Sequence, residues 1–301
     1  MRVLIMANKN RRCFAPFVAE QGEALAKAGV EVVWFGLTGH GVGGYLRNLP
    51  RLCQCIRREK PDLIHAHYGL CGLVATLQRR VPVVVTYHGS DINTPSIRKL
   101  SRLAMRRAAH NIFVSNRLQL LAGADMEKST VLPCGVDTAV FHPGDKDAAR
   151  RAMGLAPDGC YILFAGAFDN TVKNAPLAQA ACRLLPGAEL KELQGYTRQE
   201  VAQLMTAADA LLITSFSEGS PQVVKEALAV GLPVVSVDVG DVRERIAATE
   251  GCFVADNYSA EALAEGLRQA IQHKTCTAPD SFADVNDVAA TLVQIYSSVV
   301  S

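Results

Sequence analysis

No apolar run in the sequence is long enough to cross a membrane. The longest runs, at residues 81–85 and 233–237, have the length of a strand and contain proline, whereas a membrane-spanning helix needs about 18–20 apolar residues. The first ten residues, MRVLIMANKN, lack the apolar length and the cleavage site of a signal peptide. We therefore expect a cytoplasmic protein whose only membrane contact would be peripheral, at the inner face.

The sequence also lacks a C-x-x-C pair. Its nine cysteines are scattered and odd in number, and only Cys53 and Cys55 lie close together. A disulfide framework or a zinc site needs paired or clustered cysteines. This pattern predicts reduced thiols and no bound metal.

Aromatic residues are scarce, at 6%, and no stacking motif accompanies the basic residues, which argues against nucleic-acid binding. Charge is unevenly distributed: residues 1–141 hold 19 Lys and Arg against 9 Asp and Glu, and the remaining residues hold 12 against 20. This asymmetry predicts two domains with different partners. A helix predicted at 96–109 carries five of the cations, and it is either a patch for anionic lipid or an ordinary solvated face.

What the sequence does contain is a repeated alternation of apolar strands and helices. At 301 residues and 49% hydrophobic content, the chain suits two domains of about 150 residues, each with its own core. The strands show little polar alternation, which is typical of parallel sheets covered on both faces. They are predicted near residues 3–6, 31–35, 63–66, 83–86, 111–114, 130–132, 161–165, 189–192, 210–214, 234–237 and 252–254. The sequence thus predicts an α/β protein with two doubly wound, Rossmann-like sheets facing a cleft. One helix is expected at 44–59, and a linker at 142–158 that contains a short helix at 146–153.

Two carboxylates stand eight positions apart in the stretch EGSPQVVKEALAVGLPVV, residues 218–235. Ser220 suits the N-cap of a helix and Pro221 its first position, and the helix predicted at 222–230 ends at a glycine. The N–H groups and the dipole at such a helix start form an anion site, while Glu218 and Glu226 can accept hydrogen bonds from hydroxyls. This combination suits a nucleotide sugar, although a capped surface helix explains the spacing equally well.

Two basic side chains follow predicted strands. Lys173 lies in a loop before a helix that begins near residue 175, where it either neutralises a phosphate or remains an exposed lysine. His88 lies in the loop TYHGSD, where Gly89 permits close backbone approach. Its ring either hydrogen-bonds a sugar hydroxyl or serves only the loop. Asp91, in the same loop, either caps the segment that follows or contacts an acceptor.

His65 and His67 form an H-x-H pair on a predicted strand. Alternate residues of a strand point to the same face, so the pair could approach one metal ion. The sequence shows no third ligand, which favours a structural or cleft-lining role.

The stretch at 218–235 resembles the E-x7-E signature of family 4 of the retaining glycosyltransferases, which have the GT-B fold. Other motifs are similar to that family in the same order: TYHGSDI at 86–92, LPCGVDTAVFHP at 132–143, AADALLITSFSEG at 207–219 and FADVNDVAATLVQIY at 282–296. Together they cover both halves of the chain. The resemblance implies an N-terminal acceptor domain at 1–142, completed by a terminal helix at 285–301, and a donor domain at 143–284.

The resemblance also implies roles for individual residues. The expected catalytic residues are His88 beside the transferred sugar, Glu218 on its hydroxyls and Lys173 on the diphosphate. Glu226 is expected to bind the ribose hydroxyls. The implied donor-binding set is Gly166, Lys173, Gly219, Ser220, Pro221, Gln222, Val223 and Glu226. No metal or other cofactor is implied, because the UDP- or GDP-linked sugar is itself a substrate.

The sequence departs from the family in two places. Ala167 stands where the family usually has an arginine that stabilises the departing diphosphate, and such a loss weakens transition-state stabilisation. The first loop, ANKNRRCFAPF, lacks the family's glycine-rich turn. The candidates for phosphate or acceptor contacts are Lys9, Arg11, Arg12 and Asp91.

These observations predict an enzyme, a hexosyltransferase that moves a hexose-type sugar from a UDP- or GDP-sugar to an acceptor hydroxyl, with retention and without metal. The acceptor would be a glycan or a lipid-linked precursor of a cell-envelope polysaccharide. Two alternatives stay open. One is a nucleotide-sugar epimerase, for which the N-terminal half shows no convincing set of acid/base carboxylates. The other is a degenerate, non-catalytic subunit that binds nucleotide sugars.

Overall fold

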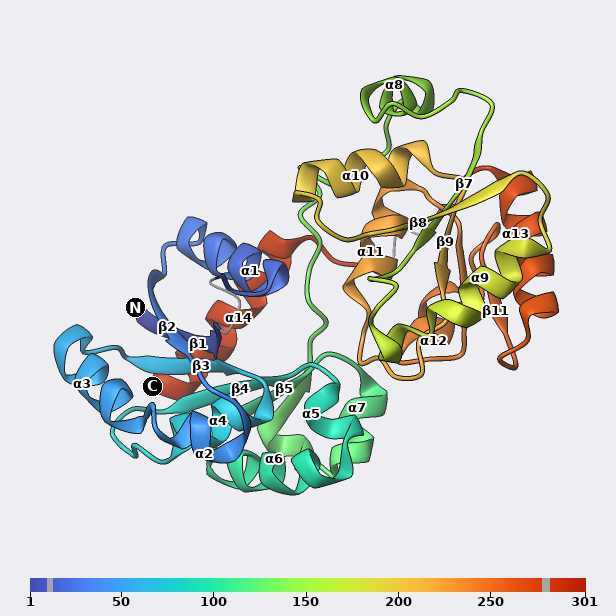
Figure 1. Cartoon of the computed structure of the whole chain (residues 1–301). Coiled ribbons are helices and arrows are strands. Elements are labelled where there is room, and N and C mark those ends of the chain that lie inside the picture. The colour runs from blue at the N-terminus through green and yellow to red at the C-terminus, as the bar shows by residue number, and fades with distance from the viewer. Residues whose placement is uncertain (10–12, 278–281) are drawn as a thin grey trace. The chain divides into compact units, whose positions relative to one another are not determined.

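The chain forms two compact units, each with its own parallel sheet (Figure 1). The computed structural model describes residues 1–9, 13–277 and 282–301. Unit 1 comprises residues 1–135 and 283–301, and unit 2 comprises residues 136–282. Every strand predicted from the sequence is present, so the prediction of two doubly wound, Rossmann-like sheets is confirmed.

The sheet of unit 1 has the strand order β2-β1-β3-β4-β5-β6. Its strands are β1 (Arg2–Asn8), β2 (Glu31–Leu37), β3 (Leu63–His67), β4 (Val83–Tyr87), β5 (His110–Phe113) and β6 (Ser129–Val131). Every residue of β3 and β4 is buried, which is why their sequences do not alternate between apolar and polar. The strand order reverses between β1 and β3, and ligands of such folds bind at the carboxyl ends of the strands beside a reversal.

Helices cover both faces of this sheet. They are α1 (Pro16–Lys27), α2 (Gly41–Leu46), α3 (Leu49–Glu59), α4 (Gly69–Thr76), α5 (Ser90–Asn93), α6 (Pro95–Arg107), α7 (Asn116–Ala122) and α14 (Val285–Val300). On β1, Val3 and Ile5 belong to the core under α1 and α14, whereas Leu4 and Met6 belong to the core on the other face. The last helix of the chain therefore completes unit 1, where it packs against α1.

Unit 2 repeats the scheme with the strand order β11-β10-β9-β7-β8. The strands are β7 (Cys160–Phe164), β8 (Ala188–Glu192), β9 (Ala210–Ile213), β10 (Val234–Val237) and β11 (Phe253–Ala255). The helices are α8 (Lys146–Ala152), α9 (Ala175–Arg183), α10 (Arg198–Ala207), α11 (Gln222–Val230), α12 (Val242–Ile246) and α13 (Ala260–His273). Here the order reverses between β7 and β9, so a ligand site is expected at the loops that follow these two strands.

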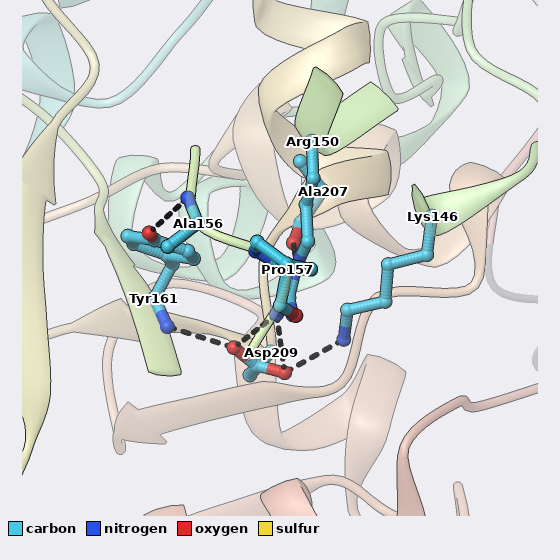
Figure 2. Close-up of polar contacts among 7 residues, drawn as sticks. All are labelled: Lys146, Arg150, Ala156, Pro157, Tyr161, Ala207 and Asp209. Atoms are coloured by element: carbon cyan, nitrogen blue, oxygen red, sulfur yellow. Dashed lines mark hydrogen bonds and ion pairs between the residues drawn. The ribbon is translucent and has the colours of Figure 1, made fainter. Parts of the chain in front are cut away.

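Asp209 ties helix α8 to the amino-terminal ends of β7 and β9 (Figure 2). Its carboxylate accepts hydrogen bonds from Lys146 Nζ at 2.7 Å, from Arg150 Nη2 at 3.0 Å and from the backbone N–H of Tyr161 at 2.7 Å. The buried Arg150 guanidinium also donates to two backbone carbonyls. The segment expected as a linker therefore contains a helix that is anchored within unit 2.

One predicted helix is wrong. The segment 44–59 forms two helices, α2 and α3, which are separated at Arg47 and Asn48. The buried side-chain amide of Asn48 donates to the carbonyls of Gly44 and Tyr45 and so satisfies the end of α2. Pro50, in the first turn of α3, has no N–H and cannot continue the preceding helix.

Within residues 1–9, 13–277 and 282–301, no helix combines the length and the apolar character that crossing a bilayer requires.

Candidate functional site

In unit 2, the loops after β7 and β9 meet at the carboxyl edge of the sheet. Thr214, directly after β9, donates its hydroxyl to the backbone carbonyls of Lys173 and Asn174, at 2.8 and 3.0 Å. The backbone N–H of Phe216 donates to the carbonyl of Val172 at 2.9 Å. These bonds fix the short turn Thr171–Lys173 against the loop that carries the first signature glutamate.

Lys173 and Glu218 form an ion pair in this corner. Lys173 Nζ lies 2.6 Å from Glu218 Oε1, and the side chains are only 22% and 15% exposed. Gly166 makes room for the lysine, since a Cβ at this position would come within 2.8 Å of Lys173 Cγ. Gly240 does the same for the glutamate loop: its φ is +61°, and a Cβ there would lie 2.9 Å from the carbonyl oxygen of Gly219.

The start of α11 borders the same loop. Pro221 is the N-cap residue and the helix begins at Gln222, so the prediction of Ser220 as N-cap is wrong by one residue. The cause is that Pro221 has an extended ψ of 118°, and Ser220 Oγ instead accepts a hydrogen bond from Arg245 Nη2 at 3.3 Å. The remaining predicted contacts, Gly219 and Val223, lie in the loop and in the first turn of α11. The start of α11 at Gln222 is therefore present where the sequence placed it.

Glu226, the second signature carboxylate, is buried in α11 and paired with an arginine. Its exposed fraction is 3%, and its Oε1 lies 2.7 Å from Arg198 Nη2. Arg198 is the first residue of α10, and its guanidinium lies over the ring of Phe141 at 4.5 Å. Arg198 is not among the residues predicted from the sequence, because an arginine at a helix start looks like an ordinary surface residue.

Arg245 is a second cation that was not predicted from the sequence. It lies on α12, pairs with Asp241 at 2.7 Å and reaches Ser220. Asp241 is buried, and its Oδ1 has no hydrogen-bond partner among the described residues. Lys173, Arg198 and Arg245 thus bring three cations to the loops and the helix start at this edge of unit 2.

In unit 1, Asp91 organises the loop that carries His88. Its buried carboxylate accepts hydrogen bonds from the backbone N–H groups of Gly69, His88 and Gly89, at 3.0, 3.1 and 2.8 Å. Burial raises the pKa of Asp91, and these backbone hydrogen bonds oppose that rise. The carboxylate therefore binds backbone N–H groups that precede it in the chain, and the expectation that Asp91 caps the segment after it is wrong, since α5 has no side-chain cap.

The His88 ring lies among aromatic side chains. Ring centroids of Tyr68 and Phe17 are 4.7 and 4.9 Å from that of His88, and His88 Nε2 is 3.0 Å from His67 Nδ1. Tyr68 has a φ of 73°, in the left-handed region that side-chain-bearing residues rarely adopt. Strain of this kind tends to gather at functional sites, and no feature of the sequence indicates it.

The H-x-H pair of β3 is buried and neutral. Burial lowers the pKa of His67 to about 3, and burial together with the neighbouring histidines lowers that of His65 well below its usual value. His65 is held by Tyr296 Oη at 2.5 Å and by Thr86 Oγ1 at 2.7 Å. Across the described part of the chain, no three His, Cys, Asp or Glu side chains are grouped so as to hold a metal ion.

A pocket of about 740 Å³ opens in unit 1 at the carboxyl ends of its central strands. Its lining includes Phe14, Tyr45, Tyr68, Leu70, Asp91 and Ile97. The volume falls in the range of small-molecule sites, and apolar walls with a few polar groups are typical of such sites.

Lys9, a candidate phosphate or acceptor contact, lies beside this pocket. Its Nζ is 5.3 Å from the ring centroid of Phe14, which lines the pocket. The other two candidates of the first loop, Arg11 and Arg12, lie outside the described residues.

Two family models match the chain. The model described as Glycosyltransferase Family 4 matches residues 15–140, and the model described as Glycosyl transferases group 1 matches residues 162–283. A curated relative, the D-inositol 3-phosphate glycosyltransferase of Actinosynnema mirum, is 31% identical over 275 residues, which cover 70% of this chain and 66% of that protein. The chain spans just under two thirds of that relative's length.

Solved structures show the same fold. The sucrose-phosphate synthase of Thermosynechococcus elongatus has a TM-score of 0.83 at 17% identity, with 99% of this chain and 98% of that chain covered. Anabaena Alr3699/HepE in complex with UDP-glucose has a TM-score of 0.80 at 19% identity, with 99% and 100% covered. At these identities the likeness establishes the architecture and leaves substrates open.

Proposed function

The chain belongs to family 4 of the glycosyltransferases, which have the GT-B fold, and from that premise we propose that it transfers a hexose-type sugar from a UDP- or GDP-linked donor to an acceptor hydroxyl. The transfer retains the anomeric configuration and needs no metal ion. The acceptor is a glycan or a lipid-linked precursor of a cell-envelope polysaccharide. Support comes from the family membership and from the residues gathered at the carboxyl edge of unit 2.

The observation that carries the proposal is the Lys173–Glu218 pair beside the start of α11. An ammonium group and helix N–H groups bind the oxygens of a diphosphate. Glu218 and Glu226 are carboxylates that accept hydrogen bonds from sugar and ribose hydroxyls. Cations for phosphate and carboxylates for hydroxyls are the two halves of a nucleotide-sugar site.

The reaction we propose breaks the bond between the anomeric carbon and the β-phosphate oxygen of the donor. The acceptor oxygen forms its bond to the anomeric carbon on the same face, and the acceptor proton passes to the diphosphate oxygen that leaves. Negative charge therefore grows on the diphosphate, where preorganised cations lower the barrier most effectively. Lys173 supplies one of these cations.

Arg245 supplies the second cation in this proposal. The family arginine is replaced by Ala167, while Arg245 donates to Ser220 in the loop before α11. Its carboxylate partner, Asp241, is buried and holds the guanidinium in place. An arginine fixed in this way can contact two phosphate oxygens at once.

Unit 1 supplies the acceptor side in this proposal. The pocket lined by Tyr45, Tyr68 and Ile97 takes the acceptor, and His88 hydrogen-bonds a hydroxyl of the transferred sugar. Tyr68 lines the pocket and also packs on the His88 ring, so it connects the two functions. Replacing Ile97 with tryptophan would narrow the pocket and should reduce transfer while leaving slow hydrolysis of the donor.

Peripheral contact with an anionic membrane surface is part of the proposal. Of the five cations on α6, Arg98 and Arg102 donate to carbonyls at the end of α7, where they satisfy the helix terminus. The other three, Lys99, Arg106 and Arg107, are exposed, and in this proposal they contact anionic lipid headgroups.

The test begins with UDP, GDP and ADP in a thermal-shift assay, since a bound nucleotide raises the apparent stability by mass action. Radiolabelled UDP- and GDP-sugars then reveal the reaction. Release of free sugar or transfer to an added acceptor supports a transferase. An altered sugar that stays on the nucleotide would identify an epimerase, and binding without turnover would identify a non-catalytic subunit.

A further inference from the structure

Three histidine rings form a stacked series in unit 1. His65 stacks on His67 with ring centroids 4.5 Å apart, and His67 stacks on His88 at 5.3 Å. His67 Nδ1 and His88 Nε2 are 3.0 Å apart, which is a hydrogen-bond distance. Because β3 and β4 are paired in parallel with His67 opposite Thr86, the end of β3 is brought level with the loop that carries His88.

The contact between His67 and His88 requires one proton between the two nitrogens. Two bare lone pairs would repel each other, and so would two N–H groups. Either His67 Nδ1–H donates to His88 Nε2, or His88 Nε2–H donates to His67 Nδ1. The two arrangements differ in where the remaining proton of each ring lies.

The far nitrogen of His67 distinguishes the two arrangements. His67 is fully buried, and its Nε2 has no hydrogen-bond partner among the described residues. If His88 were the donor, neutral His67 would carry its proton on Nε2 and bury an N–H group without an acceptor. If His67 is the donor, Nε2 is only a bare lone pair. Orphaned buried N–H groups are rarer in proteins than under-used acceptors, so the second arrangement is favoured.

We propose that His67 is a positioning residue that holds His88 in the tautomer with its proton on Nδ1. With His88 Nε2 occupied as an acceptor, the Nδ1–H group becomes the donor that His88 presents. This nitrogen lies 3.9 Å from Cys134 Sγ, a long contact to a weak acceptor that a hydroxyl oxygen can replace.

The residues around His88 hold its ring in one orientation. Asp91 accepts the His88 backbone N–H, and the rings of Tyr68 and Phe17 pack on the imidazole. His88 then donates to a hydroxyl oxygen of the transferred sugar and takes no proton from the acceptor, whose proton goes to the leaving diphosphate. This role toward the sugar rests on the proposed transferase function, whereas the tautomer of His88 does not.

The tautomer can be measured without any substrate. In the full-length protein labelled with 15N at histidine, the shifts of the two ring nitrogens show which of them carries the proton. We expect a protonated Nδ1 and a bare Nε2 in His88, the opposite of the tautomer that free imidazole side chains prefer in water. A His88 with its proton on Nε2 would overturn the proposal. This measurement uses the wild-type protein, so it tests the proposal even if none of the variants folds.

Three variants separate positioning from structural support. His67→Asn keeps an amide donor near the place of Nδ1 and should keep the His88 tautomer. His67→Phe keeps the volume of the ring but removes the donor, and should return His88 to the Nε2–H form. Tyr296→Phe removes the hydrogen bond to His65, within the same cluster, and should leave the His88 signals unchanged. A His67→Phe variant that folds and keeps the Nδ1–H form would contradict the proposal.

Turnover gives the functional readout. Hydrolysis of the labelled nucleotide sugar should fall about 10- to 100-fold in His67→Phe, by analogy with the loss seen when a partner that orients a metal-ligating histidine is removed. His67→Asn should recover most of it, with the KM for the donor unchanged. If the wild-type protein shows the Nδ1–H tautomer but turns over no nucleotide sugar, the proposed function fails and the tautomer assignment stands.

Discussion

Lys173 Nζ lies 2.6 Å from Glu218 Oε1, although the two residues are 45 positions apart in the sequence. The pair satisfies both charges within the loops that follow β7 and β9. A diphosphate with two negative charges can compete for the ammonium group, and the released carboxylate is then available to sugar hydroxyls. In the proposed function, the ion pair therefore holds both side chains in place before the donor binds. When the donor binds, Lys173 contacts the diphosphate and Glu218 contacts the sugar hydroxyls.

Replacing Lys173 with alanine is expected to weaken UDP binding about 10- to 100-fold, because a charge-assisted hydrogen bond contributes roughly 1.5–3 kcal/mol. Isothermal titration would measure the change. Lys191→Ala is the matched control, since Lys191 also pairs with a glutamate in unit 2 but has no assigned ligand. If the Lys173→Ala and wild-type proteins bound UDP with equal affinity, Lys173 would not contact the diphosphate.

Arg245 is expected to distinguish a diphosphate from a monophosphate. Arg245→Gln should weaken UDP binding about tenfold and leave UMP binding nearly unchanged, since only the second phosphate is then short of a cation. The control is Arg243→Gln, because Arg243 lies on the same helix with its side chain 41% exposed and pairs with Asp238 and Asp256. If Arg245→Gln weakened UMP binding as much as UDP binding, Arg245 would not contact the second phosphate.

Much of this architecture could be predicted from the sequence, because buried parallel strands are uninterrupted apolar runs. The apolar composition of VVVTY in β4 and ALLI in β9 identifies them as buried strands. The residues that follow such strands lie at the edge of the sheet where ligands bind. Arg198 and Arg245 could not be found in this way. Each becomes notable only when the fold brings it to Glu226 or Ser220. The φ of Tyr68 is likewise set by the packed loops and leaves no mark in the sequence.

The carboxylate of Glu226 is expected to recognise the ribose. Glu226→Gln keeps the shape of the side chain but weakens its acceptor, so it should bind UDP about tenfold more weakly, while the wild-type preference for UDP over 2′-deoxy-UDP should nearly vanish. Competition binding with both nucleotides measures the preference. Since Arg198 would lose its charged partner, the melting temperature serves as the check for folding. A Glu226→Gln variant that still prefers UDP would show that the ribose lies elsewhere.

Asp209→Ala is expected to destabilise unit 2 by about 3–5 kcal/mol, because it leaves the buried Arg150 guanidinium without its carboxylate (Figure 2). Far-UV circular dichroism in urea would follow the loss. Trp34, the one tryptophan of the chain, lies in unit 1, so its fluorescence transition is the internal control and should not move. Asp238→Ala, which breaks an exposed pair with Arg243, should change stability by less than about 1 kcal/mol.

The buried histidines are expected to make unit 1 unstable toward acid. The pKa of His67 is about 3 in the folded protein and about 6.5 in the unfolded chain. Between these values the unfolded chain binds a proton that the folded unit does not. Stability is therefore complete above about pH 6.5 and falls as the pH decreases, by about 2 kcal/mol between pH 7 and pH 5 for His67 alone.

Two neighbouring groups bear on the measurement. His65 acts in the same direction as His67, since its pKa is also lowered, whereas Asp91, whose pKa is raised, acts in the opposite direction at lower pH. Urea unfolding followed by Trp34 fluorescence should therefore be compared between pH 7 and pH 5.5. His67→Asn removes one titrating group and should flatten the pH dependence by about one proton. An unchanged slope in that variant would mean that His67 takes up its proton in the folded state as readily as in the unfolded chain.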